Sequence, residues 1–365
     1  MGFAALGLFW GSWGAELPAV QSHSHASDAA LGLALFCVGA GALLAMRPAG
    51  VAVDRLGRAV LPALAAVFAV CGFLPALVTS PGALAVVLLF LGATSGSLDV
   101  AINAEGVRAE EAGGRPVLRL AHGVFSLGAV AGSLGTAVLR AAGAGPAVAL
   151  GTFCALVLLS AGLAALLPAA PPGHEEQARL RDLLRAPGPL LLLGALCALA
   201  FFVEGAWQSW SAVHLQETLG APAGLASLAP ALLAAAMAAG RLGGQRLATR
   251  ERVLLTVAAL LAAAGSAVAA TASSSGVALA GVAAAGLGIS VCAPVLIAIG
   301  GRMALPARRG SAVSVVTTVA YLGFLLGPAA VGLIANATSL RAALAGVAGV
   351  ALLLALLARV TPGAD

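Results

Sequence analysis

The stretch GSLDVAINAEGV, residues 96–107, carries the residues best suited to proton chemistry. Asp99 lies inside a long apolar run, and Ser95 and Asn103 lie four residues before and after it. On a helix this i, i+4, i+8 spacing puts the three polar side chains on one face. Removal from water favours a protonated carboxyl group, so Asp99 could exchange a proton near neutral pH. The alternative is a static carboxylate bonded to Asn103 or to an arginine.

Two further carboxylates, Glu16 and Glu204, lie inside apolar runs. A charge at the bilayer centre costs about 2.5–3.5 kcal/mol on insertion scales and is by default a functional hypothesis. We therefore predict that Asp99, Glu204 and Glu16 take part in proton coupling. Glu16 lies near the end of its run, beside Leu17 and Pro18, so an ordinary helix-end role is an equal alternative for it.

Aromatic and amide side chains accompany these carboxylates. A carboxylate, an amide and indole rings together can bind a neutral polar ligand or an organic cation. The predicted substrate-binding residues are Trp10, Trp13, Asn103, Trp207, Gln208, Trp210 and Tyr321. For the Ser and Thr residues around Tyr321 helix packing is the favoured interpretation, because small polar residues often join membrane helices, and Tyr321 is the weaker binding candidate.

The histidines and cysteines show no metal-ligand spacing, and the five cysteines fall one at a time in separate apolar runs. There is no phosphate-binding G-x-x-x-x-G-K-[ST] motif. We therefore expect no metal and no cofactor. His122 lies one turn inside its run and could relay protons, although a structural hydrogen bond is the favoured interpretation.

These residues must be positioned by membrane helices. The chain is 61% hydrophobic and only 9% charged, whereas soluble domains carry roughly 25% charged residues. The apolar runs do not alternate, and each can cross a bilayer with about 20 helical residues. We predict twelve spans, over 2–20, 29–49, 59–79, 83–106, 117–139, 146–168, 189–215, 222–243, 253–272, 276–299, 311–335 and 340–360.

Arginine placement predicts the orientation. All nineteen basic residues are arginine, and seventeen, Arg241 among them, fall at connections on one side; only Arg140 and Arg341 fall on the other. The positive-inside rule then puts both termini of this multi-pass protein in the cytoplasm, with the spans in the plasma (inner) membrane. The net charge of +5 follows from this topology, so we expect the lipid bilayer and no nucleic acid as a partner, and a monomer.

The two halves of the chain resemble each other. The sequence WGSW begins at Trp10, and WQSW begins 197 residues later at Trp207. This repeat predicts an N-terminal six-helix bundle over 1–168, a cytoplasmic central loop over 169–188 and a C-terminal six-helix bundle over 189–365. Alternating-access transporters are built from such repeats, with the binding site at their interface.

The segment GVAVDRLGR, residues 50–58, resembles the cytoplasmic loop signature of the major facilitator superfamily. The resemblance implies an all-α integral membrane fold with twelve transmembrane helices in two pseudo-symmetric six-helix bundles. It also implies a cytoplasmic gate, in which Gly57 permits a tight turn and Asp54 pairs with arginine or caps a helix. With two charged residues near the predicted cytoplasmic end of the fourth span, the gate comprises Gly50, Asp54, Arg55, Gly57, Arg58, Glu105 and Arg108.

The sequence LDVAINAEG resembles the fourth-span motif of the fucose-permease-like branch of that superfamily, and HGVFSLG, residues 122–128, is similar to uncharacterised bacterial permeases of the branch. The resemblance implies that Asp99 is the proton-titrating carboxylate and Asn103 its polar neighbour. It implies a secondary transporter rather than an enzyme, with proton-coupled symport of a sugar-like or other small polar solute as the expected activity. Proton-driven efflux of a drug or secondary metabolite is the alternative, and a non-transporting membrane receptor is a remote one.

Overall fold

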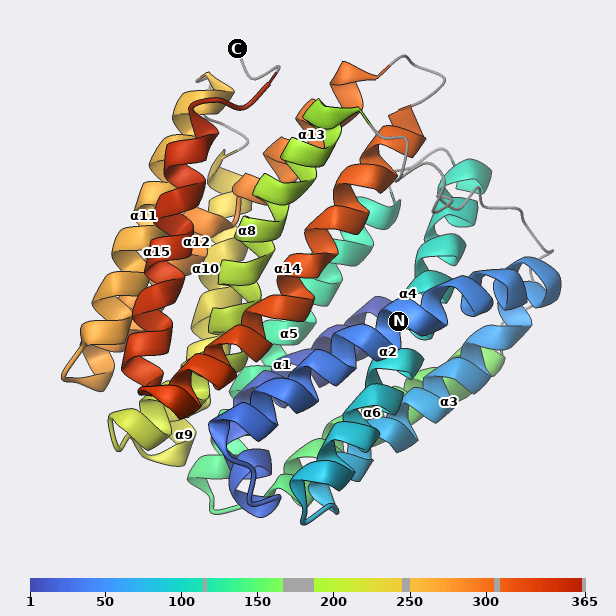
Figure 1. Cartoon of the computed structure of the whole chain (residues 1–365). Helices are drawn as coiled ribbons and strands as arrows, with labels where there is room; N and C mark the ends of the chain where they lie inside the picture. The colour runs from blue at the N-terminus through green and yellow to red at the C-terminus, as the bar shows by residue number, and fades with distance from the viewer. Residues whose placement is uncertain (114–116, 167–186, 245–249, 305–308, 363–365) are drawn as a thin grey trace. The chain divides into compact units, whose positions relative to one another are not determined.

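The computed structural model describes residues 1–113, 117–166, 187–244, 250–304 and 309–362, and over these ranges it is helical with no strand. The chain forms two compact units, Met1–Gln177 with Ala221–Ala231, and Ala178–Gly220 with Leu232–Asp365 (Figure 1). A short segment of the second half of the sequence therefore belongs to the first unit. Most of the predicted central loop, 169–188, lies outside the described residues.

The long helices of the first unit pack in pairs. Helix α4 packs along α2, α1 along α5, and α3 along α6. Short helical turns, η1 (Gly57–Ala59) and η2 (Leu74–Ala76), flank α3, and α9 (Ala223–Ala226) packs on α5. The bounds are α1 Gly2–His23, α2 Asp28–Leu56, α3 Val60–Phe73, α4 Pro81–Gly113, α5 Val117–Ala141 and α6 Pro146–Ala165.

Glycines set the closest helix approach in this unit. A Cβ atom added at Gly92 of α4 would overlap the backbone carbonyl oxygen of Val38 on α2. Gly57, at the end of α2, has a φ of 59°, in the left-handed region that favours glycine. The tight turn predicted at Gly57 is therefore present.

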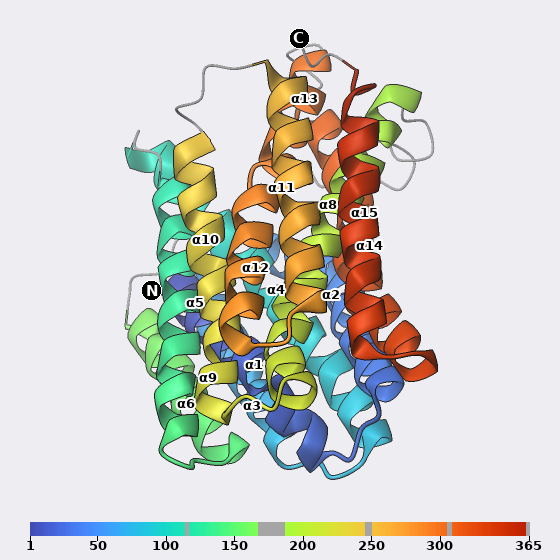
Figure 2. The same ribbon diagram turned by 90° about the vertical axis from the view of Figure 1, so that its left-hand side faces the viewer.

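In the second unit α8 packs along α14, and α11 packs against both α12 and α15. Figures 1 and 2 both show α11 and α15 side by side. The helices are α8 (Gly188–Val213), η3 (His214–Thr218), α10 (Leu228–Gly244, which enters this unit at Leu232), α11 (Glu251–Thr271), α12 (Ser275–Ile289), α13 (Cys292–Met303), α14 (Arg309–Ala337) and α15 (Leu340–Ala358).

The tenth predicted span, 276–299, is interrupted in the structure. Helix α12 ends at Ile289 and α13 begins at Cys292. Pro294 has no N–H group, so it cannot donate the helical hydrogen bond that the carbonyl of Ser290 would otherwise accept. The tenth predicted span thus consists of two helices, which together form the apolar segment Ser275–Met303.

Ten helices of the described residues are long and apolar enough to cross a membrane. Helix α1 and the shorter apolar segment Val60–Ala76 account for the other two expected spans. The all-α, twelve-helix architecture predicted from the sequence is confirmed. Large apolar side chains remain exposed on α6, α11 and α15, as expected for helices that face lipid; they include Leu159, Leu163, Val257, Leu260, Leu353 and Leu356.

Candidate functional site

The polar face predicted for α4 is joined by hydrogen bonds. Asn103 donates from Nδ2 to Oδ1 of Asp99 at 3.1 Å and to its backbone carbonyl at 2.8 Å. One turn earlier, Trp10 of α1 donates from Nε1 to the hydroxyl of Ser95 at 3.1 Å. Two of the predicted substrate-binding residues, Trp10 and Asn103, thus lie on or against the face that carries Asp99.

Asp99 has a neutral donor as its hydrogen-bond partner. His122 of α5 lies close enough to act electrostatically on the carboxylate. The imidazole is exposed and meets the ring of Phe3 edge-on at a centroid distance of 5.0 Å. Among the residues that the structure describes, no arginine forms an ion pair with Asp99, in contrast to Glu16 and Glu204.

Glu16 is fully buried and faces Arg140 of α5, with 3.8 Å between Oε1 and Nε. Neither of its carboxylate oxygens has a hydrogen-bond partner among the described residues. Next to it, Ser227 donates to the carbonyl of Ala15 at 3.1 Å, and Ser133 donates to the carbonyl of Ser227 at 2.9 Å. Glu16 therefore belongs to a buried polar layer that joins α1, α5 and the segment Ala221–Ala231.

Glu204 of α8 pairs with Arg241, with 3.7 Å between Oε1 and NH2. Arg241 lies in the last turn of α10, which ends at Gly244, one residue beyond the predicted end of the eighth span. Arg241 also donates from Nε to the carbonyl of Ser290 at 3.4 Å. That acceptor is the one that Pro294 leaves without a helical partner, so the proline was the available signal for this contact.

The tryptophans of WQSW are buried inside the second unit. Trp207 donates from Nε1 to Ser266 at 2.8 Å, and Trp210 donates to the carbonyl of Pro328 at 3.0 Å; both side chains are completely buried. Trp13 is buried in the first unit. With their polar atoms bonded or their rings enclosed, these three residues contribute packing in this arrangement, and their role in substrate binding stays a prediction.

Gln208 and Tyr321 are more open. Gln208 is exposed one turn after Glu204, on the same face of α8. Tyr321 of α14 is half-buried against two aromatic rings, with centroid distances of 6.1 Å to Phe201 and 6.2 Å to Phe324. These two side chains and the Glu204–Arg241 pair are polar groups of the second unit that retain access to solvent.

The predicted gate residues lie at the ends of α2 and α4. Asp54 is half-buried and Arg55 is exposed in the last turn of α2, and Gly50, six residues before the end of that helix, is buried. The side chain of Arg58 lies outside the described residues. Glu105 and Arg108 form an ion pair at 3.2 Å, as their spacing of three residues on a helix allows.

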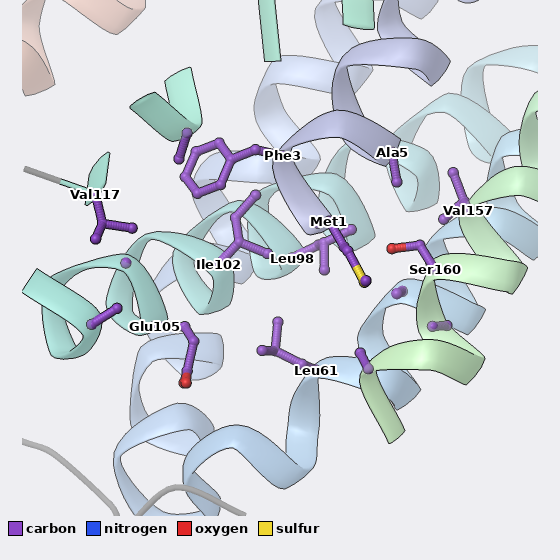
Figure 3. A pocket seen from close by; sticks show the side chains of 17 residues that line it. Met1, Phe3, Ala5, Leu61, Leu98, Ile102, Glu105, Val117, Val157 and Ser160 are labelled. Atoms are coloured by element: carbon purple, nitrogen blue, oxygen red, sulfur yellow. The ribbon is translucent and has the colours of Figure 1, made fainter. Parts of the chain in front are cut away.

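A cavity of about 330 Å³ lies in the first unit among α1, α3, α4, α5 and α6. Figure 3 shows Phe3, Leu61, Leu98 and Ile102 around it, with Glu105 at one side. Asp99 and Asn103 do not line it. The cavity is thus an apolar space within the bundle, separate from the polar face of α4.

Within the described ranges, no three His, Cys, Asp or Glu side chains are grouped so as to hold a metal ion. The five cysteines are all free thiols. Cys197 and Cys292 lie near each other on α8 and α13, and Cys197 contacts the carbonyl of Ala293 at 3.9 Å. The chemistry that these sites offer is therefore proton exchange, ion pairing and hydrogen bonding.

Comparison with known proteins gives consistent results. Residues 1–283 match the profile of the Major Facilitator Superfamily. The chain is 35% identical over 368 residues to an uncharacterized MFS-type transporter of Yersinia pestis, covering 98% of this chain and 94% of that protein. Its fold matches a mutant of the nucleoside transporter NupG (TM-score 0.82, 15% identity, 99% of both chains). It also matches a D-xylose-proton symporter (TM-score 0.77, 15% identity, 100% of this chain and 97% of that one).

Proposed function

Since this chain belongs to the major facilitator superfamily of secondary transporters, we propose that it moves a small polar solute into the cell together with protons. The solute and protons would cross by alternating access of the two halves around a central site. We also propose that it belongs to the fucose-permease-like branch, on the residues around Asp99. The cytoplasmic location of both termini, and of the gate at Asp54, Arg55, Glu105 and Arg108, are parts of the same proposal.

The observation that carries the proposal is that, among the described residues, no arginine pairs with Asp99, whereas its bond from Asn103 suits a static carboxylate as well. An arginine held against a carboxylate favours its ionised form. Asp99 instead accepts a hydrogen bond from the amide of Asn103, so a proton can bind there without breaking an ion pair. His122, exposed and nearby, is a suitable relay between Asp99 and water. Glu16 and Glu204 could bind a proton only by giving up their ion pairs with arginine, so we propose Asp99 as the principal carrier.

The solute would contact the accessible polar and aromatic side chains. We propose Trp10 and Asn103 in the first half, and Gln208 and Tyr321 in the second, as the residues that bind it directly. Trp13, Trp207 and Trp210 lie deeper and would shape the site by supporting these side chains. A half-buried aromatic ring with a polar edge suits a sugar-like solute.

Internal pH in proteoliposomes tests this proposal. A trapped pH dye would report acidification when a panel of sugars and other small polar solutes is added outside. Asp99→Asn should abolish solute-dependent acidification, because an amide cannot carry the proton. Asp28→Asn is the matched control, since it makes the same chemical change on a carboxylate that bonds Gln21 near a loop, and it should acidify like wild type.

Two results would count against symport through Asp99. Acidification that persists in Asp99→Asn would remove this residue from the proton path. Alkalinisation of the interior on adding solute would indicate exchange against protons, and would favour the export of a drug or secondary metabolite.

A further inference from the structure

We propose that Arg241 binds a carboxylate group on the transported solute, in competition with Glu204. The inference rests on the proposed function and narrows its substrate class from small polar solutes to organic acids with a polar body, such as sugar acids. The evidence is the position of the Arg241 guanidinium group, the hydrogen bond that holds it in place and the N–H donors that it leaves unused.

Arg241 lies in the last turn of α10, three residues before Gly244, where the helix ends. Its side chain is 41% exposed. The guanidinium nevertheless lies 3.7 Å from the carboxylate of Glu204 on α8, whose side chain is only 13% exposed. Arg241 is therefore an accessible cation next to an ionisable group that is largely enclosed by the bundle.

The guanidinium is held from one side by the interrupted tenth span. Nε donates to the carbonyl of Ser290, which is free because Pro294 lacks an N–H group. A Cβ added at Gly240 would overlap the hydroxyl of Ser290, so α10 approaches this interruption closely. The arginine is thus oriented before any solute binds, which lowers the entropic cost of binding.

The outer edge of the guanidinium keeps donors available. Within the described part of the chain, NH1 and NH2 make no hydrogen bond, and the 3.7 Å between NH2 and Glu204 is an ion-pair distance rather than a hydrogen bond. Parallel N–H groups of this kind bind a carboxylate through two hydrogen bonds. A solute carboxylate could therefore make contacts that Glu204 does not make.

Relative exposure favours an anion over a cation. The Arg241 side chain is 41% exposed, whereas that of Glu204 is 13% exposed, so an arriving solute meets the positive group first. Cys197 of α8 lies near Glu204 and has Cys292 beside it. Gln208, exposed one turn from Glu204, can bond a hydroxyl of the same solute.

The test is equilibrium binding to purified full-length protein by calorimetry. The probes are galacturonate, gluconate, succinate and benzoate, with galactose, glucitol and benzamide as neutral counterparts. We expect at least one acid to bind at least about tenfold more tightly than its neutral counterpart. Arg241→Gln should weaken the binding of that acid at least about tenfold, and Arg241→Lys should weaken its binding less. Glu204→Gln should make the acid bind more tightly, because it removes the competing carboxylate.

Two further variants guard against misfolding and general charge effects. Arg241→Gln leaves Glu204 without its partner, so Glu204→Gln/Arg241→Gln removes both charges, and it should fold yet still fail to bind the acid. Arg302→Gln is the matched control, because Arg302 pairs with Glu251 at another arginine–glutamate contact, and it should bind the acid like wild type.

The inference is overturned if none of the four acids binds wild type, if the neutral counterparts bind equally well, or if the double variant keeps wild-type affinity. The proposed function can be refuted independently of this inference. Acid binding that depends on Arg241, without any solute-dependent proton movement, would refute symport and keep this site. Proton entry driven by neutral sugars through Asp99, with no acid bound, would do the reverse.

Discussion

Asp99 accepts a hydrogen bond from an amide, whereas Glu16 and Glu204 each face an arginine. The difference matters because proton binding to a paired carboxylate must compete with the guanidinium. The sequence made all three carboxylates candidates for proton coupling, with Asp99 favoured by the resemblance and Glu16 equally suited to a helix-end role. Their neighbours separate them into one group with a neutral partner, one buried pair and one partly accessible pair.

The buried pair of Glu16 and Arg140 gives a prediction about stability. Arg140→Gln should lower the free energy of unfolding by about 3–5 kcal/mol, because it leaves a buried carboxylate without its counter-charge. Glu16→Gln/Arg140→Gln should recover most of that loss. Chemical denaturation in detergent micelles would measure both.

Arg341→Gln provides the comparison for this prediction. Arg341 is the other arginine on the predicted outer side, and it donates to the carbonyl of Ala272. It forms no ion pair within the described residues, so Arg341→Gln should lower the free energy of unfolding by less than Arg140→Gln does. Equal destabilisation by Arg140→Gln and Arg341→Gln would contradict a charge-dependent role for the Glu16 pair.

At the scale of the helices, proline and glycine determine how the polar residues are placed. Pro294 interrupts the tenth span and frees the carbonyl that orients Arg241. Gly92 lets α4 approach α2 until their backbones touch, and this fixes α4, the helix that carries Asp99. Small residues commonly permit such close helix contacts in membranes.

Two glycines of α4 offer a matched test. Gly92→Ala should destabilise the protein by about 1–3 kcal/mol, as overpacking does elsewhere, because its Cβ would overlap the carbonyl of Val38. Gly82→Ala places the same methyl group where no atom lies within 4 Å, and should leave stability unchanged or slightly higher. Thermal unfolding in detergent would compare them, and similar midpoints for the two variants would contradict the close contact.

At the scale of the whole molecule, exposed apolar side chains and arginines are distributed as expected for a membrane protein. The described helices expose large apolar side chains on α6, α11 and α15, and these helices belong to the sixth, ninth and twelfth predicted spans. Seventeen of the nineteen arginines fall at connections or ends of one side. This asymmetry predicts the orientation through the positive-inside rule.

Reporter fusions test that orientation. Green fluorescent protein joined after Asp365 should fluoresce, since it matures in the cytoplasm, and alkaline phosphatase at the same position should be inactive. Alkaline phosphatase joined after Gly143, in the predicted outer connection between α5 and α6, should be active. The opposite pattern at both positions would reverse the predicted topology.

Sequence alone was sufficient for the fold class, the spans, the turn at Gly57 and the polar face of Asp99 and Asn103. These depend on local quantities, namely the length of apolar runs, glycine at a special φ and the helical period. A lipid environment makes these local signals more reliable, because a backbone that crosses a membrane must form a helix or a closed barrel. The all-α architecture followed for the same reason.

Only the tertiary structure paired Glu16 with Arg140 and Glu204 with Arg241, and enclosed Trp207 and Trp210. Each pairing joins residues far apart in the chain, and helical periodicity says which residues share a face but not which helix that face meets. The sequence places Arg241 near the end of a span, but only the structure shows that it donates to the carbonyl of Ser290, between α12 and α13. Partner choice depends on packing between helices, and no local pattern in the sequence encodes it.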